Sequence, residues 1–237
     1  MKKSLKSSFN LGFLNHDDPL SRHHLIAHGD TMSALHAIEL TLNEEQRDCY
    51  QEITNVAMGQ AADLLARLLN VYVILPIPNV NLLEVNELQM ALSELENSQS
   101  VSAVCQGFIG AGISGEALLI FNDASFDDIA RLMDFEGEVD DSSEIELLTD
   151  VASILNGACL NGIAQQLDVN FSLGHPVVLG QHCSIGDLVK AENKQWKKAL
   201  AIEINYHIKD YNIDCDLLLL FTEDSLLSLN HRISFLL

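Results

Sequence analysis

The strongest constraint on the fold is an internal repeat with a spacing of one hundred residues. The segment EALLIF at residues 116–121 returns as DLLLLF at residues 216–221, and Ser125 and Ser225 each follow four residues later. Two copies of a unit of about one hundred residues account for most of a chain of 237 residues. The repeat therefore predicts two similar halves that pack together as one domain.

Each half is expected to contain a long helix followed by strands. Asn55 and Asn156 occupy matching places in the two helical segments, at an offset of 101. We divide the domain into a first half at residues 42–133, a linker at 134–141 and a second half at 142–237. The predicted fold class is α/β (α+β): a duplicated domain with pseudo-two-fold symmetry, whose halves share one β-sheet with the helices packed on it.

Local signals place the elements. Asn43 and Gln46 form a capping-box pattern, so a helix is expected from there to about Leu69. The apolar run at residues 71–75 predicts a buried strand, and a shorter helix is expected around residues 82–95.

A glycine-rich segment at residues 109–115 lies between a strand pattern at 101–108 and the first copy of the repeat. Because this segment joins two strands and opens no helix, we interpret it as a hairpin turn and not as a phosphate-binding loop. In the second half, a helix is expected from about Ser142, with strands at 199–208 and 214–221.

The chain is strongly acidic, with a formal net charge of -21 at pH 7, and Arg131 is the one basic residue between Arg67 and Lys190. Nucleic-acid binding relies on lysine and arginine to neutralise phosphates, so no nucleic-acid partner is expected. The same deficit disfavours a site that binds a free phosphorylated metabolite by charge. If the chain acts on phosphate, the compensating cation has to come from elsewhere.

We expect a cytoplasmic protein with no membrane partner. The longest apolar runs are five residues, far below the roughly 20 needed to span a bilayer. The five cysteines form no CxxC pair, which indicates reduced thiols.

No metal site is predicted. Residues 1–41 are polar and are expected to form a flexible extension, and their histidines match no standard ligand spacing. The acidic run at residues 134–146 leads into the second long helix, where negative charge suits the helix dipole, and we prefer that explanation to ligand binding.

A polar row lies on the first long helix. At about 100° per residue, Asp48, Glu52, Asn55 and Gly59 fall within an arc of roughly 60°. The opposite side carries apolar residues that should face a core, namely Ile53, Ala57, Leu64 and Leu68. Most such rows are solvated helix faces, but a carboxylate, a carboxamide and a bare glycine could also hold a small reactive group presented by a partner.

The pattern Asp48-x3-Glu52-x2-Asn55-x22-Pro78 resembles the signature of the CheC, CheX and FliY chemotaxis phosphatases, in which Asp or Ser, Glu, Asn and Pro occur at this spacing. With the repeat and the strand order, the resemblance covers about residues 42–237 and marks them as a CheC-like phosphatase domain. It implies a hydrolase of two-component signalling that removes the aspartyl phosphate of a CheY-type response regulator.

By this resemblance, Asn55 orients the attacking water and Glu52 contacts the partner's active-site lysine. Asp48 and Gly59 belong to the partner-binding surface, and Pro78 fixes the helix against a neighbouring strand. An acyl phosphate already has a good leaving group, so positioning of water can suffice without a nucleophile from the enzyme. The phosphorylated partner is expected to bring the Mg²⁺, and the chain is expected to need no cofactor of its own.

The second helix departs from the pattern. At the offset of 101, Ser153 and Asn156 stand in the places of Glu52 and Asn55, and Leu179 stands in the place of Pro78. Without the carboxylate, a degenerate second site is expected, in which Asn156 either still orients a water or cross-links neighbouring backbone.

Two other functions stay open for the whole domain. One is a non-catalytic module that binds a phosphorylated response regulator, as flagellar switch proteins do. The other is a scaffold whose residues 1–41 recruit a further chemotaxis protein.

Overall fold

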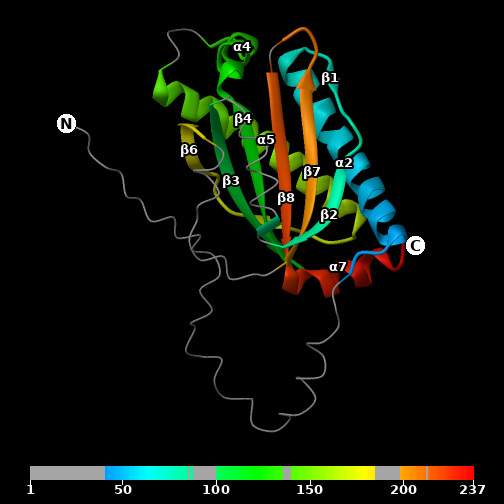
Figure 1. Ribbon diagram of the computed structural model, residues 1–237. Helices are drawn as coiled ribbons and strands as arrows, with labels where there is room; N and C mark the ends of the chain where they lie inside the picture. Colours follow the sequence, from blue (N-terminus) through cyan, green and yellow to red (C-terminus); the bar gives the residue numbers. More distant parts are fainter. Residues whose placement is uncertain (1–40, 85, 88–99, 136–139, 185–197, 212) are drawn as a thin grey trace, which may run out of the picture. The chain divides into compact units, whose positions relative to one another are not determined.

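The computed structural model describes residues 41–84, 86–87, 100–135, 140–184, 198–211 and 213–237 (Figure 1). The extension predicted at residues 1–41 lies outside this part of the chain, apart from Thr41. Residues 42–237 form one unit, and the description below concerns that unit alone.

One antiparallel sheet, eight-stranded in the described residues, forms the centre of the unit, in the order β1-β7-β8-β4-β3-β5, with β2 also paired to β7 and β6 to β3. The strands are β1 (Val73–Ile74), β2 (Asn79–Glu84), β3 (Val101–Gly110), β4 (Ile113–Asn122), β5 (Ser172–Leu173), β6 (Val177–Cys183), β7 (Lys198–Ile208) and β8 (Ile213–Thr222).

The sheet has the pseudo-two-fold symmetry that the repeat predicts. Strands β4 and β8, the two copies of the repeated segment, pair at its centre, where Leu118 lies opposite Leu218. These two residues are also equivalent at the repeat spacing of one hundred, so the symmetry axis passes between them. Each half adds one long inner strand, β3 from the first and β7 from the second. The short outer strands pair with the inner strand of the other half: β1 and β2 with β7, and β5 and β6 with β3. The fold class predicted from the sequence is confirmed.

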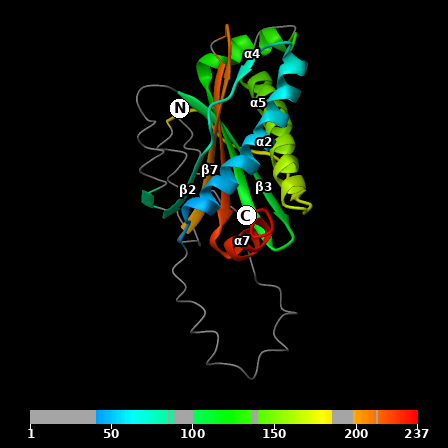
Figure 2. The ribbon, with the colours of Figure 1, turned by 90° about the vertical axis from the view of Figure 1, so that its right-hand side faces the viewer.

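Two long helices, α2 (Glu44–Leu69) and α5 (Asp141–Gln166), pack on each other and on the same face of the sheet (Figure 2). Two short helices, α4 (Phe126–Leu132) and α7 (Leu226–Ile233), each follow a 3₁₀ turn and lie at opposite ends of the sheet (Figure 1).

The long helices begin where their capping residues stand. Asn43 Oδ1 accepts from the Gln46 backbone N–H at 2.8 Å, and Gln46 Oε1 accepts from the Asn43 N–H at 3.1 Å, so the predicted capping box is confirmed. Asp140 caps α5 by accepting from the Ser143 N–H at 2.9 Å. Helix α2 ends at Asn70, whose φ of 52° is left-handed, a conformation that asparagine tolerates well.

The core lies between the sheet and the long helices. Alternate residues of β4 and β8, among them Leu119, Phe121, Leu217, Leu219 and Phe221, are at most 1% exposed. Helix α5 passes the length and hydropathy criteria for a membrane span, but 61% of its apolar window is buried, as in the core helix of a soluble protein.

The glycine-rich segment is a hairpin, as predicted. Strands β3 and β4 pair directly, from Gly110–Ile113 at the turn to Val101–Asn122 at the far end. Ala111 and Gly112 have φ values of 52° and 76°, and two positive φ angles are the requirement of a type I′ turn.

Three expectations need correction. The buried strand at 71–75 is only Val73–Ile74, at the sheet edge, where Ile74 is exposed because β1 has one neighbour, β7. Residues 82–84 belong to β2 and not to a helix, because they continue its ladder with β7. Residues 86–87 are helical as expected, and residues 85 and 88–95 lie outside the described part of the chain. Residue 141, placed in the linker, is already helical.

Leu64 and Leu68 do not face the core and are about half exposed. The buried side of α2 shifts along the helix, from Ile53 and Ala57 near its start to Leu65 and Leu69 near its end. The helix therefore turns a different face inward at each end, and a single straight stripe, as assumed from the sequence, describes only its first half.

Candidate functional site

The predicted row lies on the solvent side of α2. Asp48, Glu52 and Asn55 are exposed, and Gly59 is partly buried. A Cβ added at Gly59 would meet nothing within 4 Å, so the space in front of this end of the row is open. At 1.5 Å per residue, the row is about 16 Å long from Asp48 to Gly59. This length suits contact with a partner protein better than contact with a small molecule.

The three polar side chains of the row are available for contacts outside the chain. Within the described residues, the side chains of Asp48, Glu52 and Asn55 make no intramolecular hydrogen bond or ion pair. A carboxamide with both its donor and its acceptor unused can accept from a water proton and donate to a phosphate oxygen. The arrangement therefore has the chemistry that water positioning requires.

Pro78 lies beside α2, immediately before β2, and is buried. Gln51, the neighbour of Glu52 on the helix, donates its Nε2–H to the Pro78 carbonyl at 3.1 Å. This bond ties α2 to the start of β2, and it uses the proline backbone and not its ring. Ile77, next to it, is 81% exposed and offers an apolar contact close to the row.

A second tie holds the opposite side of the helix. Tyr50, which is buried, donates its hydroxyl to Asn230 Oδ1 of α7 at 2.9 Å. Burial raises the pKa of the Tyr50 phenol, so this hydroxyl keeps its proton and remains a donor. Helix α2 is thus fixed on two sides, and it presents Glu52 and Asn55 from a rigid support.

The buried cysteines are poor nucleophiles. The five form no disulfide, and burial raises the pKa of the thiols of Cys105 and Cys159 to about 12. Cys49, beside Asp48, also has a thiol pKa raised by burial. Because the thiolate is the reactive form, cysteine-dependent phosphoester chemistry is not supported by these residues.

The residues predicted for a second site do not come together on one surface. Ser153 is exposed and donates to the Thr149 carbonyl at 2.8 Å, whereas Asn156 is completely buried. Asn156 donates its Nδ2–H to Gln106 Oε1 at 3.3 Å, and Gln106 in turn donates to the Gly174 carbonyl at 2.9 Å. Asn156 therefore cross-links α5 to β3 inside the molecule, where no partner protein can reach it.

The burial pattern shows a different match between the long helices. At an offset of 102, Asn156 corresponds to Thr54, and both are fully buried, while Asp150 corresponds to Asp48, and both are exposed. The counterpart of Asn55 is then Gly157. The apolar positions carry this signal in the sequence, because Leu65 and Leu167 match at 102 and not at 101.

The second half also contains a counterpart of Pro78. Pro176 immediately precedes β6, as Pro78 immediately precedes β2. The expectation that Leu179 stands in the place of Pro78 is therefore wrong, because the offset between the halves is smaller in these outer strands than in the helices.

No protein-family model and no curated protein matches the sequence. Solved structures do match. FliY of Thermotoga maritima is similar to this chain with a TM-score of 0.61 at 17% identity, over 82% of this chain and 98% of that one. A CheC-like superfamily protein from Shewanella sp. PV-4 matches with a TM-score of 0.51 at 13% identity, over 72% of this chain and 97% of that one.

FliM of H. pylori, solved as a FliM–SpeE complex, matches with a TM-score of 0.56 at 12% identity, over 82% of this chain and 97% of that one. The chain thus has the fold shared by CheC-like proteins, FliY and FliM. At these identities the likeness concerns the fold, and function has to be argued from the site.

Proposed function

We propose that this protein is a cytoplasmic phosphatase that hydrolyses the aspartyl phosphate of a CheY-type response regulator. The observation that carries the proposal is the exposed row on α2, in which Glu52 and Asn55 stand about 4.5 Å apart along a helix fixed on two sides. The fold shared with FliY and the CheC-like protein supports it.

In the proposed mechanism, Asn55 positions a water in line with the phosphorus and Glu52 pairs with the lysine of the receiver domain. The carboxamide adds no charge beside the phosphoryl group, which matters on a surface with this excess of acid. Mg²⁺ and the lysine, both on the partner, neutralise the phosphate. Ile77 adds an apolar contact beside the row.

The test is phosphate release from a CheY-type receiver that has been phosphorylated with a small acyl phosphate in the presence of Mg²⁺. We expect Asn55→Ala to reduce the stimulated rate by about 100-fold, the cost of losing the alignment of a reacting group. Glu52→Ala should reduce it by about tenfold, or about 1.4 kcal/mol.

The matched control is Asn161→Ala, which removes an exposed carboxamide from the other long helix and should leave the rate unchanged. Wild-type rates in the Asn55→Ala, Glu52→Ala double variant would disprove the mechanism.

A second function is favoured by the likeness to FliM. In this alternative the same surface of α2 binds a phosphorylated receiver without hydrolysing its phosphate, as in a flagellar-switch module. The FliM structure was solved in complex with another protein, SpeE, so this fold does support protein docking. Binding that depends on receiver phosphorylation, with no acceleration of phosphate loss, would favour this alternative.

A further inference from the structure

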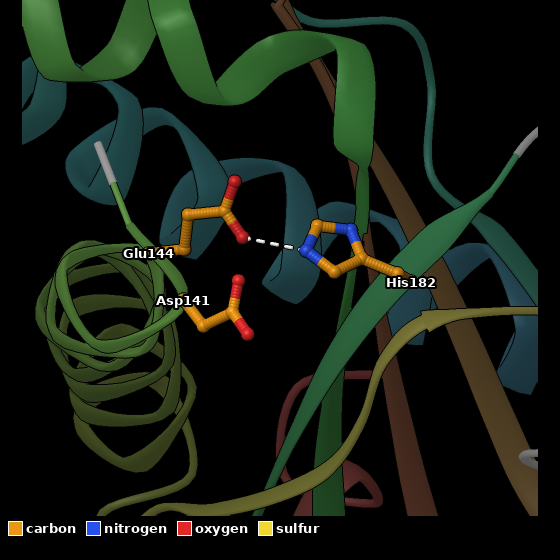
Figure 3. A group of neighbouring side chains, drawn as sticks. All are labelled: Asp141, Glu144 and His182. Atoms are coloured by element: carbon orange, nitrogen blue, oxygen red, sulfur yellow. Dashed lines mark ion pairs between the residues drawn. The ribbon is translucent and has the colours of Figure 1, made fainter. Parts of the chain in front are cut away.

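A cluster of metal-ligating side chains lies at the start of α5, on the other long helix from the row. Asp141 and Glu144 come from the first turn of α5, and His182 comes from the end of β6. Figure 3 shows their side chains converging on one point. Each offers a ligand atom, and these three atoms all lie within 4.8 Å of one another.

The imidazole of His182 is held in a fixed orientation. Its Nδ1 is hydrogen-bonded to Asp123 Oδ2 at 3.0 Å, and Asp123 Oδ1 accepts from the fully buried Ser102 hydroxyl at 2.7 Å. The Ser102 oxygen also accepts from the His182 backbone N–H at 3.2 Å. A carboxylate behind one ring nitrogen is the usual support of a metal-binding histidine, and it directs the other nitrogen to the ion.

The other nitrogen points at the two carboxylates. His182 Nε2 lies 2.7 Å from Glu144 Oε2, and the Gln181 amide donates to that same oxygen at 2.9 Å. The carboxylate of Asp141, which is exposed, turns into the space beside this contact (Figure 3). One nitrogen and two oxygen ligands therefore face a common centre that is open to solvent on the Asp141 side.

The charge of the cluster is unbalanced. Asp123, Asp141 and Glu144 surround a single imidazole, so the net charge stays negative whether or not the ring is protonated. Arg131, the one basic residue between Arg67 and Lys190, bonds to Asp128 at 2.9 Å. A divalent cation would supply the missing charge.

The fold itself does not demand this cluster. Ser102 pairs with Phe121 in the sheet, and the equivalent pair in the other half is Leu200 with Phe221. Leucine therefore serves in one half at the position where the other half carries the serine that supports Asp123. Ser102 and Asp123 belong to the first half, and they support His182 of the second half.

We propose that His182, Glu144 and Asp141 bind a divalent transition-metal ion such as Zn²⁺, with Asp123 orienting the histidine. Zinc holds such ligands at about 2.0–2.2 Å, and an imidazole with two carboxylates is a donor set that it accepts. The ion joins the start of α5 to the end of β6. The ligands come from two segments about 40 residues apart that only the fold brings together, so no sequence motif marks the site.

Zinc binding to the full chain, stripped of metal with a chelator, can be measured by isothermal titration calorimetry. The background variant replaces His16, His23, His24, His28 and His36 by Asn, because imidazoles near the N-terminus could bind zinc independently. In this background we expect one site per chain. His182→Asn and Glu144→Gln should each weaken it at least tenfold, and His175→Asn, an exposed histidine outside the cluster, should not.

Circular dichroism of the metal-free variants shows whether each is folded. Asp141→Asn, on an exposed side chain, preserves the fold even if His182→Asn does not, and it should also weaken zinc binding at least tenfold. Wild-type zinc affinity in folded His182→Asn, Glu144→Gln or Asp141→Asn would overturn the proposal, as would loss of all binding in the background variant.

Discussion

At the scale of single residues, substitutions of Gly59 can test fold stability and partner docking separately. Glycine inside a helix costs about 0.5–1 kcal/mol relative to alanine, and here a Cβ would meet nothing within 4 Å. We therefore expect Gly59→Ala to raise Tm by about 2–4 °C per kcal/mol gained, measured by thermal unfolding.

Gly59→Gln tests the same position as part of the docking surface. Its side chain starts from a Cβ that meets nothing within 4 Å in the free protein, so we expect Tm not to fall, but it projects where the partner should lie. The stimulated rate of receiver dephosphorylation should drop several-fold. An unchanged dephosphorylation rate in Gly59→Gln would show that Gly59 does not lie on the docking surface.

Asp216 should make stability depend on pH. Burial raises the pKa of this carboxyl on β8, nearby Glu203 and Asp214 add to the rise, and the hydrogen bond from Asn205 opposes it. The folded state thus binds the proton more tightly than the unfolded chain, so ionised Asp216 costs stability at neutral pH, and the cost vanishes as pH falls below the ordinary carboxyl pKa.

Asp216→Asn should therefore raise the free energy of unfolding at pH 7, with a gain that shrinks as the pH is lowered toward 4. Asparagine keeps an acceptor for Asn205. Urea unfolding at several pH values measures the difference between variant and wild type, and a gain that is equal at all pH values would contradict the assigned cause.

At the scale of elements, the contact between α2 and α5 depends on Gly162. A Cβ at this position would lie 2.7 Å from the Ala57 Cα, a backbone atom that cannot move aside. Gly162→Ala should therefore destabilise the fold by about 1–3 kcal/mol, the usual cost of overpacking.

The control for this contact lies on the same helix. Gly157→Ala makes the same change where a Cβ meets nothing within 4 Å, so it should be neutral or stabilising. Urea unfolding compares the two. If the two variants had the same free energy of unfolding, the close contact between α2 and α5 at Gly162 would not contribute to stability.

The same elements show what sequence can and cannot predict. Capping residues, the hairpin and the repeated central strands are set by neighbours close in the chain, and these predictions were confirmed. Strands β5 and β6 and the buried side of α5 depend on contacts with distant segments. For that reason Asn156 was matched to Asn55, although burial equates it with Thr54.

At the scale of the whole molecule, the duplication places two equivalent long helices, α2 and α5, on the sheet. Only α2 carries both the glutamate and the asparagine that the proposed mechanism uses. The positions of α5 that match Asp48, Glu52 and Asn55 are Asp150, which is exposed, and Ile154 and Gly157, which are partly buried. One carboxylate is therefore already in place, and Pro176 stands before β6 as Pro78 does before β2. The second half lacks the glutamate and the asparagine, and the exposed Asn161 stands in the place of Gly59.

Ile154→Glu, Gly157→Asn and Asn161→Gly together should create a working site on α5. In an Asn55→Ala background these changes are expected to restore about a tenth of the wild-type rate, which leaves the activation barrier about 1.4 kcal/mol too high. Gly157→Asn alone, without the carboxylate, should restore less. Phosphate release from the phosphorylated receiver measures all three variants. If the triple change leaves Tm intact and restores nothing, the row is insufficient by itself. The exposed Ile77 then becomes the feature that the first half has and the second half lacks, because a partner must be bound to the helix before a water can be aligned.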